Sequence, residues 1–428
     1  MMANVLSQHF LTCPFALSLS KGEPLPPTPF MVRPAHRERG IREFTMHRMN
    51  PTNDDMDSDS HPQFPTDQPL TILHTEASLG WGGQEIRIVL EAEALSRMGH
   101  RLLIAAPRES QIFSEARARG ITTLPLLMTR LVFPVALARL VGIIGQYQID
   151  IVNTHSSLDS WIASLAARLS RRQPRIIRTR HIHTDIRGGK IIYGRLPGRI
   201  MTTSEAIRRT LIARCAVRPD RIVTIPTGVD CDRFHPAVAE TFRQEMGIDR
   251  DTILIGMVSV LRSWKGHRYF LEAVDRLRKQ AARLAFVIVG DGQMRAQIER
   301  WRADLHLEST VTLTGFRSDV PQILRALDVL VLPSYAHEGI PQIVLQAQAM
   351  ETAVVASDID GIREAVIDGE TGLLSPPRDA EALAGRIERL IGDAALRARL
   401  GRQGRARILA QWTLPQMTDR ILELYRSR

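Results

Sequence analysis

The sequence contains few cysteines and few aromatic residues. Its three cysteines are odd in number and widely spaced, at Cys13, Cys215 and Cys231. Such spacing argues against a disulfide framework and against a cysteine-based zinc site, and it favours a reducing compartment. Aromatic residues make up 5% of the chain and do not alternate with the basic ones. Because single-stranded nucleic acids are bound largely by stacking bases on aromatic rings, we expect no nucleic-acid partner.

A long uninterrupted apolar run is also missing. The most apolar long stretch, 131–147, is broken by Pro134 and Arg139, whereas a membrane span needs about 20 apolar residues. The first twenty residues contain an apolar patch at 15–19 with no basic residue before it. We therefore expect neither a spanning helix nor a signal peptide, and a cytoplasmic location.

Positive charge is in excess and unevenly distributed. The formal net charge is +10, and residues 168–199 hold ten Lys/Arg against one acid, Asp185. A basic stretch of this kind predicts attraction to an anionic surface, such as lipid headgroups at the inner face of the cytoplasmic membrane or a lipid-linked phosphate. The alternative interpretation is a solvated, arginine-rich face without a partner.

Residues 1–66 differ in composition from the rest. They are rich in Pro, Ser, Asp, Asn and Met and show no sustained hydrophobic period. Such segments cannot bury enough apolar area to offset the entropy of ordering, so we expect a disordered extension. Met46, Met49 or Met56 is an alternative start of the chain.

From residue 70 onward, short apolar runs alternate with segments of helical spacing. The apolar runs of the first half are 70–74, 102–106, 150–152, 175–177, 199–201 and 221–225. After a polar stretch at 235–251 the pattern restarts, with runs at 253–258, 286–289, 311–313, 328–333 and 353–356. Continuous apolar strands that alternate with helices indicate parallel sheets covered on both faces.

The sequence therefore predicts an α/β protein with two doubly wound, Rossmann-like domains facing across a cleft. We place the first domain at 67–245, the second at 246–411 and a C-terminal helix at 412–428. Ligands of open parallel sheets bind beyond the carboxyl ends of the strands, so we expect the site between the two domains.

Two segments at predicted strand ends indicate the chemistry. Arg262 and Lys265, three residues apart in one loop, suit a diphosphate. Glu338-Gly339-Ile340-Pro341 joins a buried strand to the start of a helix, where free N–H groups and the helix dipole favour an anion. A carboxylate beside such a turn can bind sugar hydroxyls. A nucleotide-sugar combines both ligands.

The motifs, taken in order, resemble those of the retaining family 4 glycosyltransferases of the GT-B fold. The resemblance covers about residues 70–427 and is densest at 256–379. In the second half it is carried by Lys265-Gly266, Gly290-Asp291-Gly292, Pro333-Ser334, Glu338-Gly339-Ile340-Pro341, Gly361-Ile362-Arg363-Glu364 and Asp368-Gly369-Glu370-Thr371-Gly372. In the first half it is carried by Gly82-Gly83, Thr203-Ser204 and Pro226-Thr227-Gly228-Val229-Asp230.

The resemblance implies a role for each matching residue. The first domain would bind the acceptor and the second the donor. Lys265 and Arg262 would neutralise the diphosphate, and the backbone amides of Gly339 and Ile340 would cap it. Glu338 would hold sugar hydroxyls. The remaining donor-site residues would be Gly82, Gly83, Gly290, Asp291 and Gln346.

Histidines are the other candidates for this site. His181, at a strand end, matches the family histidine that approaches the reacting side of the sugar. His155 is either a second site residue or a structural polar residue, and we expect His267 and His337 to be solvated neighbours. We take no DxD-type carboxylate pair as a metal site, and we expect neither a metal ion nor another cofactor to be required.

The chain departs from the family pattern at two positions. Gln346 replaces a glutamate that usually accepts hydrogen bonds from the ribose, and glutamine keeps one acceptor while losing the charge. Val260 replaces the usual arginine, for which Arg262 can substitute.

The resulting functional hypothesis is a retaining glycosyltransferase. It would move a sugar from a nucleotide-diphosphate donor to a glycan or lipid-linked acceptor in envelope polysaccharide, lipopolysaccharide or glycolipid synthesis. Peripheral contact with an anionic membrane fits the basic stretch. The alternatives are a catalytically silent nucleotide-sugar-binding subunit and a nucleotide-sugar epimerase of the same fold.

Overall fold

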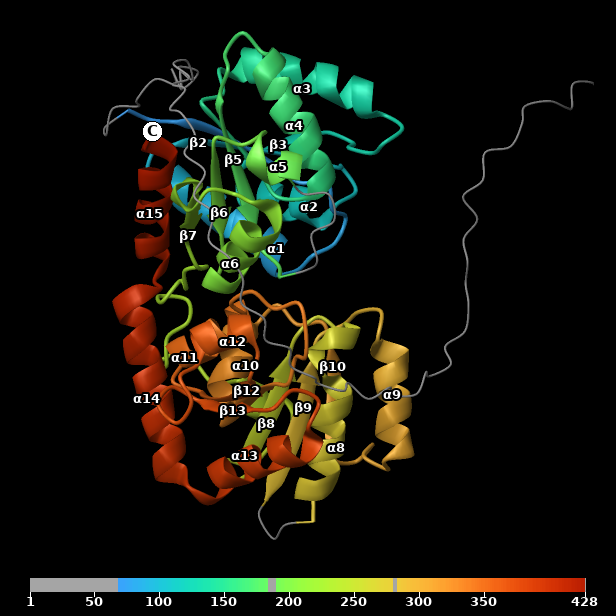
Figure 1. Cartoon of the computed structure of the whole chain (residues 1–428). Helices are drawn as coiled ribbons and strands as arrows, with labels where there is room; N and C mark the ends of the chain where they lie inside the picture. Colours follow the sequence, from blue (N-terminus) through green and yellow to red (C-terminus); the bar gives the residue numbers. More distant parts are fainter. Residues whose placement is uncertain (1–67, 184–189, 280–282, 428) are drawn as a thin grey trace, which may run out of the picture. The chain divides into compact units, whose positions relative to one another are not determined.

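The structure is a computed structural model that describes residues 68–183, 190–279 and 283–427. The extension predicted for residues 1–66 lies outside the described residues. Two fully parallel sheets follow one another along the chain, as Figure 1 shows. The prediction of two doubly wound α/β sheets is confirmed, while the domain boundaries stay predictions.

The first sheet has seven strands in the order β3-β2-β1-β4-β5-β6-β7. These strands are β1 (Thr71–Thr75), β2 (Arg101–Ala106), β3 (Thr122–Pro125), β4 (Ile151–Thr154), β5 (Arg175–Arg180), β6 (Arg199–Thr202) and β7 (Ile222–Thr224). The helices between them are α1 (Gly83–Arg97), α2 (Gln111–Ala118), α3 (Phe133–Tyr147), α4 (Ser157–Leu169), α5 (Lys190–Gly194) and α6 (Glu205–Cys215). A one-turn 3-10 helix, Pro219–Arg221, precedes β7.

The second sheet repeats this order with six strands, β10-β9-β8-β11-β12-β13. They are β8 (Ile253–Val258), β9 (Leu284–Val289), β10 (Val311–Gly315), β11 (Val329–Leu332), β12 (Ala353–Ser357) and β13 (Leu373–Ser375). The helices are α7 (Phe242–Glu245), α8 (His267–Leu277), α9 (Arg295–Asp304), α10 (Val320–Ala326), α11 (Gln342–Ala349), α12 (Asp360–Ala365), α13 (Ala380–Gly392), α14 (Ala394–Gln411) and α15 (Leu414–Arg426). The sequence pattern missed β3 and β13, which are short edge strands with few apolar residues.

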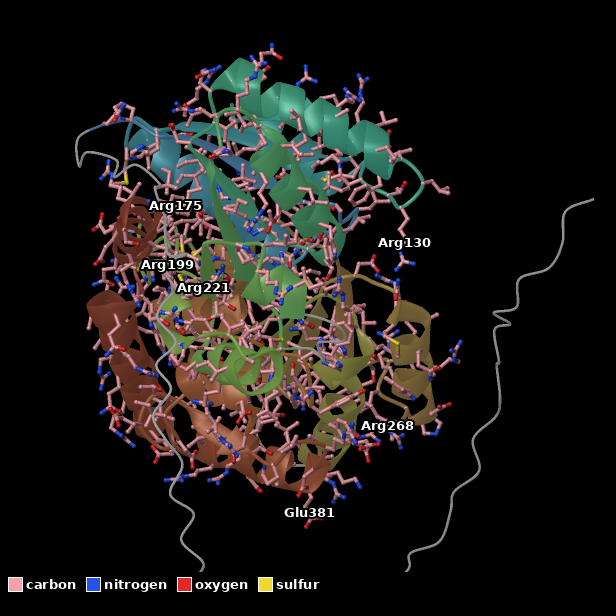
Figure 2. The ribbon with its side chains drawn as sticks, turned by 45° about the horizontal axis from the view of Figure 1, so that its top comes forward. Arg130, Arg175, Arg199, Arg221, Arg268 and Glu381 are labelled. Atoms are coloured by element: carbon pink, nitrogen blue, oxygen red, sulfur yellow. The ribbon has the colours of Figure 1, made fainter. Side chains whose placement is uncertain are left out.

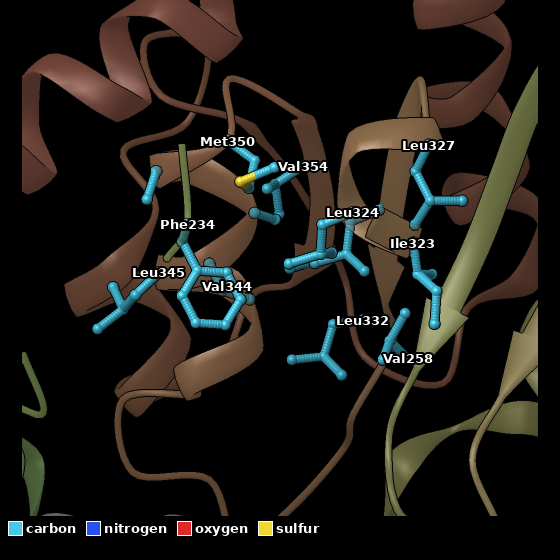
Figure 3. Close-up of a cluster of buried hydrophobic side chains, with 14 of the residues drawn as sticks. Phe234, Val258, Ile323, Leu324, Leu327, Leu332, Val344, Leu345, Met350 and Val354 are labelled. Carbon is cyan, nitrogen blue, oxygen red and sulfur yellow. The ribbon is translucent and has the colours of Figure 1, made fainter. Parts of the chain in front are cut away.

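Alternate residues of the central strand β11 pack on opposite faces of the second sheet. Leu330 and Leu332 belong to the cluster that Figure 3 shows, together with residues of α10 and α11. Val329 and Val331 belong to the other cluster, which includes residues of α8 and α13. This double burial is the reason that β11 reads as a continuous apolar run in the sequence.

Helix α15 packs against the first sheet although it follows the second in sequence. Its residues Leu414, Met417 and Ile421 are buried in the same cluster as β1, β2 and α1. The crossing segment is held by two backbone hydrogen bonds of Val229, one from its N–H to the carbonyl of Trp412 and one from the N–H of Leu414, both 2.8 Å. A Thr413 capping box begins the helix. The described ends of the chain thus meet at the first sheet.

A pair of helix glycines tests this packing. In α14 a Cβ on buried Gly401 would lie 2.0 Å from the backbone oxygen of Glu351, whereas a Cβ on Gly385 in α13 would meet nothing within 4 Å. We expect Gly401→Ala to lower the free energy of unfolding by about 1–3 kcal/mol through overpacking. The control Gly385→Ala should raise it by up to about 1 kcal/mol, because alanine favours a helix. Urea unfolding of both variants decides, and equal effects of the same sign would contradict the packing.

Candidate active site

The two sheets share a strand order that reverses direction next to their first strand. In the first sheet β1 lies between β2 and β4, and in the second β8 lies between β9 and β11. The loops that leave the carboxyl ends of such neighbouring strands diverge to opposite faces of the sheet and leave room for a ligand. The predicted site residues lie on these loops and on the helices that follow them.

Lys265 and Glu338 come from the loops after the adjacent strands β8 and β11, and their side chains meet. The Lys265 Nζ donates to Glu338 Oε1 at 2.7 Å. The Lys265 side chain is 17% exposed and that of Glu338 is 8% exposed. A charge pair that is mostly withdrawn from water is screened less than a surface pair, so each charge acts strongly on a ligand beside it.

The backbone of the Lys265 loop is held by close contacts at Gly266 and Gly290. Gly266 has a φ of +79°, and a Cβ there would lie 2.0 Å from the backbone oxygen of Pro333. Gly290 has a φ of +136°, and its Cβ would lie 1.9 Å from the backbone oxygen of Ser259. Asp291 accepts a backbone hydrogen bond of 2.9 Å from Leu261, the residue before Arg262. Gly290 and Asp291 therefore fix the backbone of the Lys265 loop at Ser259 and Leu261.

Arg262 lies in the same loop and accepts a backbone hydrogen bond of 3.1 Å from Lys265, while its side chain packs against Trp264. Its guanidinium carbon stands 5.3 Å from the centre of the Trp264 ring and the residue is exposed. The Trp264 ring in turn meets His337 edge-on at 5.4 Å. Arg262 thus retains its charge toward solvent, while Lys265 is paired within the protein.

Gly339 and Ile340 precede α11 and offer free backbone donors. Within the described part of the chain, their amide N–H groups donate to no protein acceptor. The two amides lie just ahead of the amino-terminal end of α11, where the helix dipole is positive. Gln346 lies one turn further along α11 and is partly buried. Its side chain makes no hydrogen bond to another described residue.

The glycine loop of the first sheet contacts α11. Gly82 caps α1 and Gly83 begins it. The side chain of Gln342, the first residue of α11, donates from Nε2 to the backbone oxygen of Gly83 at 2.6 Å. The same loop is anchored at Glu76, whose carboxyl group accepts from the backbone N–H of Ser78 at 2.8 Å and from the Gln84 side chain. Gly82 and Gly83 are therefore near the amino end of α11.

His181 is buried at the end of β5 and lies near Gly339. A Cβ on Gly339 would come within 2.8 Å of the His181 backbone oxygen and 3.0 Å of Thr203 Oγ1. Thr203 Oγ1 donates to that same oxygen at 3.0 Å. His181 Nε2 lies 2.9 Å from Nδ1 of His155. Burial lowers the pKa of His181 well below its ordinary value, with help from Arg87, Arg178 and Arg180.

A second contact between the motif loops and the first sheet involves Glu364. Its Oε1 accepts from the backbone N–H of Ala206 at 2.7 Å and its Oε2 accepts from that of Glu205 at 2.8 Å. Both donors lie in the first turn of α6, so the carboxylate caps this helix from α12. Burial raises the pKa of Glu364, and the two backbone hydrogen bonds oppose the rise.

One expectation from the sequence, that His267 is a solvated neighbour, is wrong. His267 is 2% exposed and lies 3.2 Å from Ser259 Oγ, so it is buried and not a solvated neighbour. Burial, aided by Lys265, lowers its pKa to about 3. Glu76 and Glu91, which anchor buried hydrogen bonds of the first sheet, were not selected from the sequence. The one signal for Glu91 was its position as a polar residue among the apolar residues of a helical pattern.

The basic stretch is partly structural. Arg175 and Arg178 are buried in β5, and Arg175 donates to the backbone oxygen of Tyr425 at 2.7 Å. Arg199 and Arg221, which Figure 2 labels on the same part of the molecule, donate to the backbone oxygens of Asp220 and Gly194. The guanidinium groups of Arg175, Arg199 and Arg221 bind backbone carbonyls, so only part of the stretch is available to a partner. Among the described helices, none is both long and apolar enough to cross a membrane.

Comparisons with known proteins agree with this architecture. Residues 81–233 match the family model described as Glycosyltransferase Family 4, and residues 238–407 match that of Glycosyl transferases group 1. The chain is 29% identical to UDP-Gal:alpha-D-GlcNAc-diphosphoundecaprenol alpha-1,3-galactosyltransferase of Escherichia coli, over 68% of this chain and 78% of that protein. It is 30% identical to D-inositol 3-phosphate glycosyltransferase of Frankia alni, over 60% of this chain and 70% of that protein.

Solved structures show the same fold. HepE of Anabaena, in complex with UDP and glucose, superposes with a TM-score of 0.75 at 20% identity, covering 84% of this chain and 100% of that one. A glycosyltransferase from Rickettsia africae superposes with a TM-score of 0.76 at 24% identity, covering 84% of this chain and 98% of that one. The predicted arrangement of two Rossmann-like sheets is the arrangement of these proteins.

The anchor of the glycine loop predicts a pH effect on stability. Burial and the nearby Asp159 carboxylate raise the pKa of Glu76 to about 8 from the ordinary glutamate value of 4.5. A raised folded-state pKa contributes stability below pH 4.5 that is lost as pH rises through 8. Glu76→Gln stays neutral, so it should become more stable than the parent between these values, by at most about 5 kcal/mol. Urea unfolding from pH 5 to 9 measures this, with exposed Glu109→Gln as the control. Parallel pH profiles of parent and Glu76→Gln would refute it.

Proposed function

The chain belongs to glycosyltransferase family 4, whose members are retaining, nucleotide-sugar-dependent enzymes of the GT-B fold, and we propose that it transfers a sugar from a UDP donor to a lipid-linked acceptor. Membership confirms the predicted reaction class, sugar transfer from a nucleotide donor. The UDP base, the acceptor and the role of each site residue are the proposal. HepE, which is similar in fold, is seen with UDP and glucose, and the Escherichia coli relative is named for UDP-Gal and a diphosphoundecaprenol-linked acceptor.

The Lys265–Glu338 pair is the observation that carries the proposal. A cation and a carboxylate 2.7 Å apart, beside two free backbone amides, present complementary groups to a diphosphate and to sugar hydroxyls. We assign Lys265 and the amides of Gly339 and Ile340 to the diphosphate, with Arg262 approaching it from the solvent side. Glu338 then accepts hydrogen bonds from the sugar. Gln346, on the same helix α11, is assigned to the ribose.

This arrangement suits the charge that develops during transfer. When the anomeric bond breaks, negative charge builds on the leaving diphosphate and positive charge on the sugar. Fixed positive groups aimed at the leaving oxygens stabilise that state more than the ground state, which is what accelerates the reaction. His181, held neutral by burial, lies on the other side of Gly339 and is assigned to the sugar.

Exposed apolar residues support an acceptor at a membrane surface. Leu131 is 94% exposed and Val135 is 61% exposed at the start of α3, and Leu127 precedes them in the loop after β3. The neighbouring Arg130 is also exposed. Apolar side chains beside a cation match the boundary between acyl chains and anionic headgroups. We propose peripheral binding at the inner face of the cytoplasmic membrane on this basis.

A thermal-shift screen tests the donor. UDP-, GDP-, ADP- and CMP-sugars are compared at equal concentration, because a ligand of the folded state stabilises it by about 2.7 kcal/mol at 100 times its Kd. We expect UDP-sugars alone to raise the melting temperature. A larger shift with another base would remove the UDP assignment and leave the reaction class intact. Transfer to a polyprenyl-diphosphate sugar then tests the acceptor.

Lys265→Ala tests the diphosphate role. We expect the variant to lose about 100- to 1,000-fold in kcat/KM, the range for removing one preorganised charge-stabilising donor. Lys279→Ala, which changes an exposed lysine just after α8, is the matched control and should leave kcat/KM unchanged. Circular dichroism verifies that both variants are folded at the assay temperature. A Lys265→Ala enzyme within twofold of the parent would remove the assignment.

A further inference from the structure

Three histidines form a row inside the first sheet. His74 lies in β1, His155 follows β4 and His181 follows β5, so they come from three adjacent strands. The Nδ1 of His74 lies 2.9 Å from Nε2 of His155, and Nδ1 of His155 lies 2.9 Å from Nε2 of His181. All three side chains are buried. Only one end of the row, at His181, is near the motif loops of the second sheet.

The other end of the row faces Glu91. The Nε2 of His74 is 3.8 Å from Glu91 Oε1, and both residues are fully buried. Neither His74 Nε2 nor Glu91 Oε2 has a hydrogen-bond partner among the described residues. Glu91 Oε1 accepts from the Tyr425 hydroxyl at 2.6 Å, and that hydroxyl accepts from Asn153 Nδ2 at 2.8 Å. The carboxylate is therefore fixed in place by α15 and β4.

Burial, aided by nearby guanidinium groups, favours the neutral form of the imidazoles in the row. Arg87, one turn before Glu91 on α1, is fully buried, and Arg178 and Arg180 on β5 also face the histidines. Burial and these guanidinium groups hold the pKa of His155 and of His181 well below the ordinary value. Burial also lowers the pKa of His74, against the attraction of Glu91. Two further buried carboxyl groups, Asp159 and Glu76, are bonded elsewhere. Asp159 accepts from the backbone N–H of His155, and Glu76 accepts from Ser78 and Gln84.

A row of neutral imidazoles can carry its protons in only two ways, because each ring has one donor and one acceptor nitrogen. Glu91 Oε1, which already accepts from the Tyr425 hydroxyl, lies 3.8 Å from His74 Nε2 and attracts a donor there, so we place the proton of His74 on Nε2, toward Glu91. His74 Nδ1 then accepts from His155, and His155 Nδ1 accepts from His181. In the reverse arrangement the lone pair of His74 Nε2 would face the Glu91 carboxylate, which is unfavourable in a buried site.

We propose that Glu91, acting through His74 and His155, fixes the proton of His181 on Nε2 and so leaves Nδ1 as a hydrogen-bond acceptor for a hydroxyl of the reacting sugar. The acceptor role of Nδ1 rests on the proposed function of His181. Glu91, His74 and His155 are positioning residues, since none of them is assigned a contact with the substrate. Tyr425 extends the same row to α15, so docking of the C-terminal helix and the state of His181 are linked.

The full-length protein labelled with ¹⁵N in histidine gives a direct test. Long-range ¹H–¹⁵N correlation spectra distinguish the two neutral tautomers and the charged form of each ring. We expect His74, His155 and His181 to be neutral at pH 7 and to carry their protons on Nε2. A charged His181, or one protonated on Nδ1, would overturn the proposal. The wild-type spectrum decides this without any variant, with assignments from single His→Gln replacements.

Glu91→Gln tests whether Glu91 determines which ring nitrogen of each histidine carries the proton. An amide has both a donor and an acceptor, so it no longer dictates which nitrogen of His74 is protonated. We expect a mixture of His181 tautomers and a loss of about 10- to 100-fold in kcat, as for other groups that orient a ligand-binding histidine, with KM for the donor little changed. Glu93→Gln, two residues along α1 and paired with surface Arg97, is the matched control. It should change neither the tautomer of His181 nor kcat.

The outcomes separate the two proposals. An unchanged His181 tautomer in Glu91→Gln would overturn the positioning role of Glu91. His181→Ala with full transfer activity would instead overturn the assignment of His181 to the sugar, while the tautomer found by spectroscopy would still stand.

Discussion

The motif loops of the second sheet are packed backbone against backbone, and the candidate site depends on this contact. The loop after β8 touches the end of β11 at Gly266 and Pro333, and a Cβ on Gly361, in α12, would lie 2.2 Å from the backbone oxygen of Gly339. No side chain fits at either contact. Because backbones at this spacing cannot slide past one another, Lys265 and Glu338 meet in one arrangement, which is the preorganisation that electrostatic stabilisation requires.

The same constraint reaches the first sheet. Gly339 approaches the backbone oxygen of His181 so closely that a Cβ would stand 2.8 Å away, and Glu364 of α12 caps the first turn of α6. The loop of Gly339 therefore lies directly against the end of β5, next to the buried His181. The two sheets have separate cores, and the candidate site joins them through the Gly339–His181 and Glu364–α6 contacts. Gly339 and Glu364 both belong to the family motifs of the sequence.

Local patterns in the sequence were sufficient for most of the fold. Continuous apolar runs predicted the central strands because both faces of each sheet are covered, and strand ends followed by Gly, Asp or Pro predicted the motif loops. The short edge strands β3 and β13 were not predicted, because Thr122–Pro125 has one leucine and is partly exposed, and Leu373–Ser375 has only two apolar residues. Lys265 and Glu338 were found because their motifs are contiguous. Their pairing follows from the adjacency of β8 and β11, which the sequence does not state.

The histidine row was beyond sequence reasoning for a different reason. Its members are separated by up to 107 positions from His74 to His181, and its anchor Tyr425 is 334 residues from Glu91. No spacing rule connects such residues. The sequence offered His181 and His155 as separate candidates, but nothing in it joined them to His74 or Glu91. For the basic stretch at 168–199, the sequence overstated the exposed charge. Arg175 and Arg178 belong to a conspicuous charge cluster in the sequence, yet in the fold both are buried.

The two halves of the site differ in electrostatic character, and this difference fits the proposed chemistry. The side formed by the second sheet offers a lysine cation, helix-terminal amides and the exposed Arg262, all suited to a leaving diphosphate. The side formed by the first sheet buries imidazoles whose pKa values are lowered by that burial, with help from nearby arginines. A charged His181 would repel the positive charge that builds on the sugar, whereas a neutral one with a free lone pair attracts it. Buried Arg87 and Arg178 are costly in isolation, and holding His181 in its neutral state is a reason for the fold to keep them there.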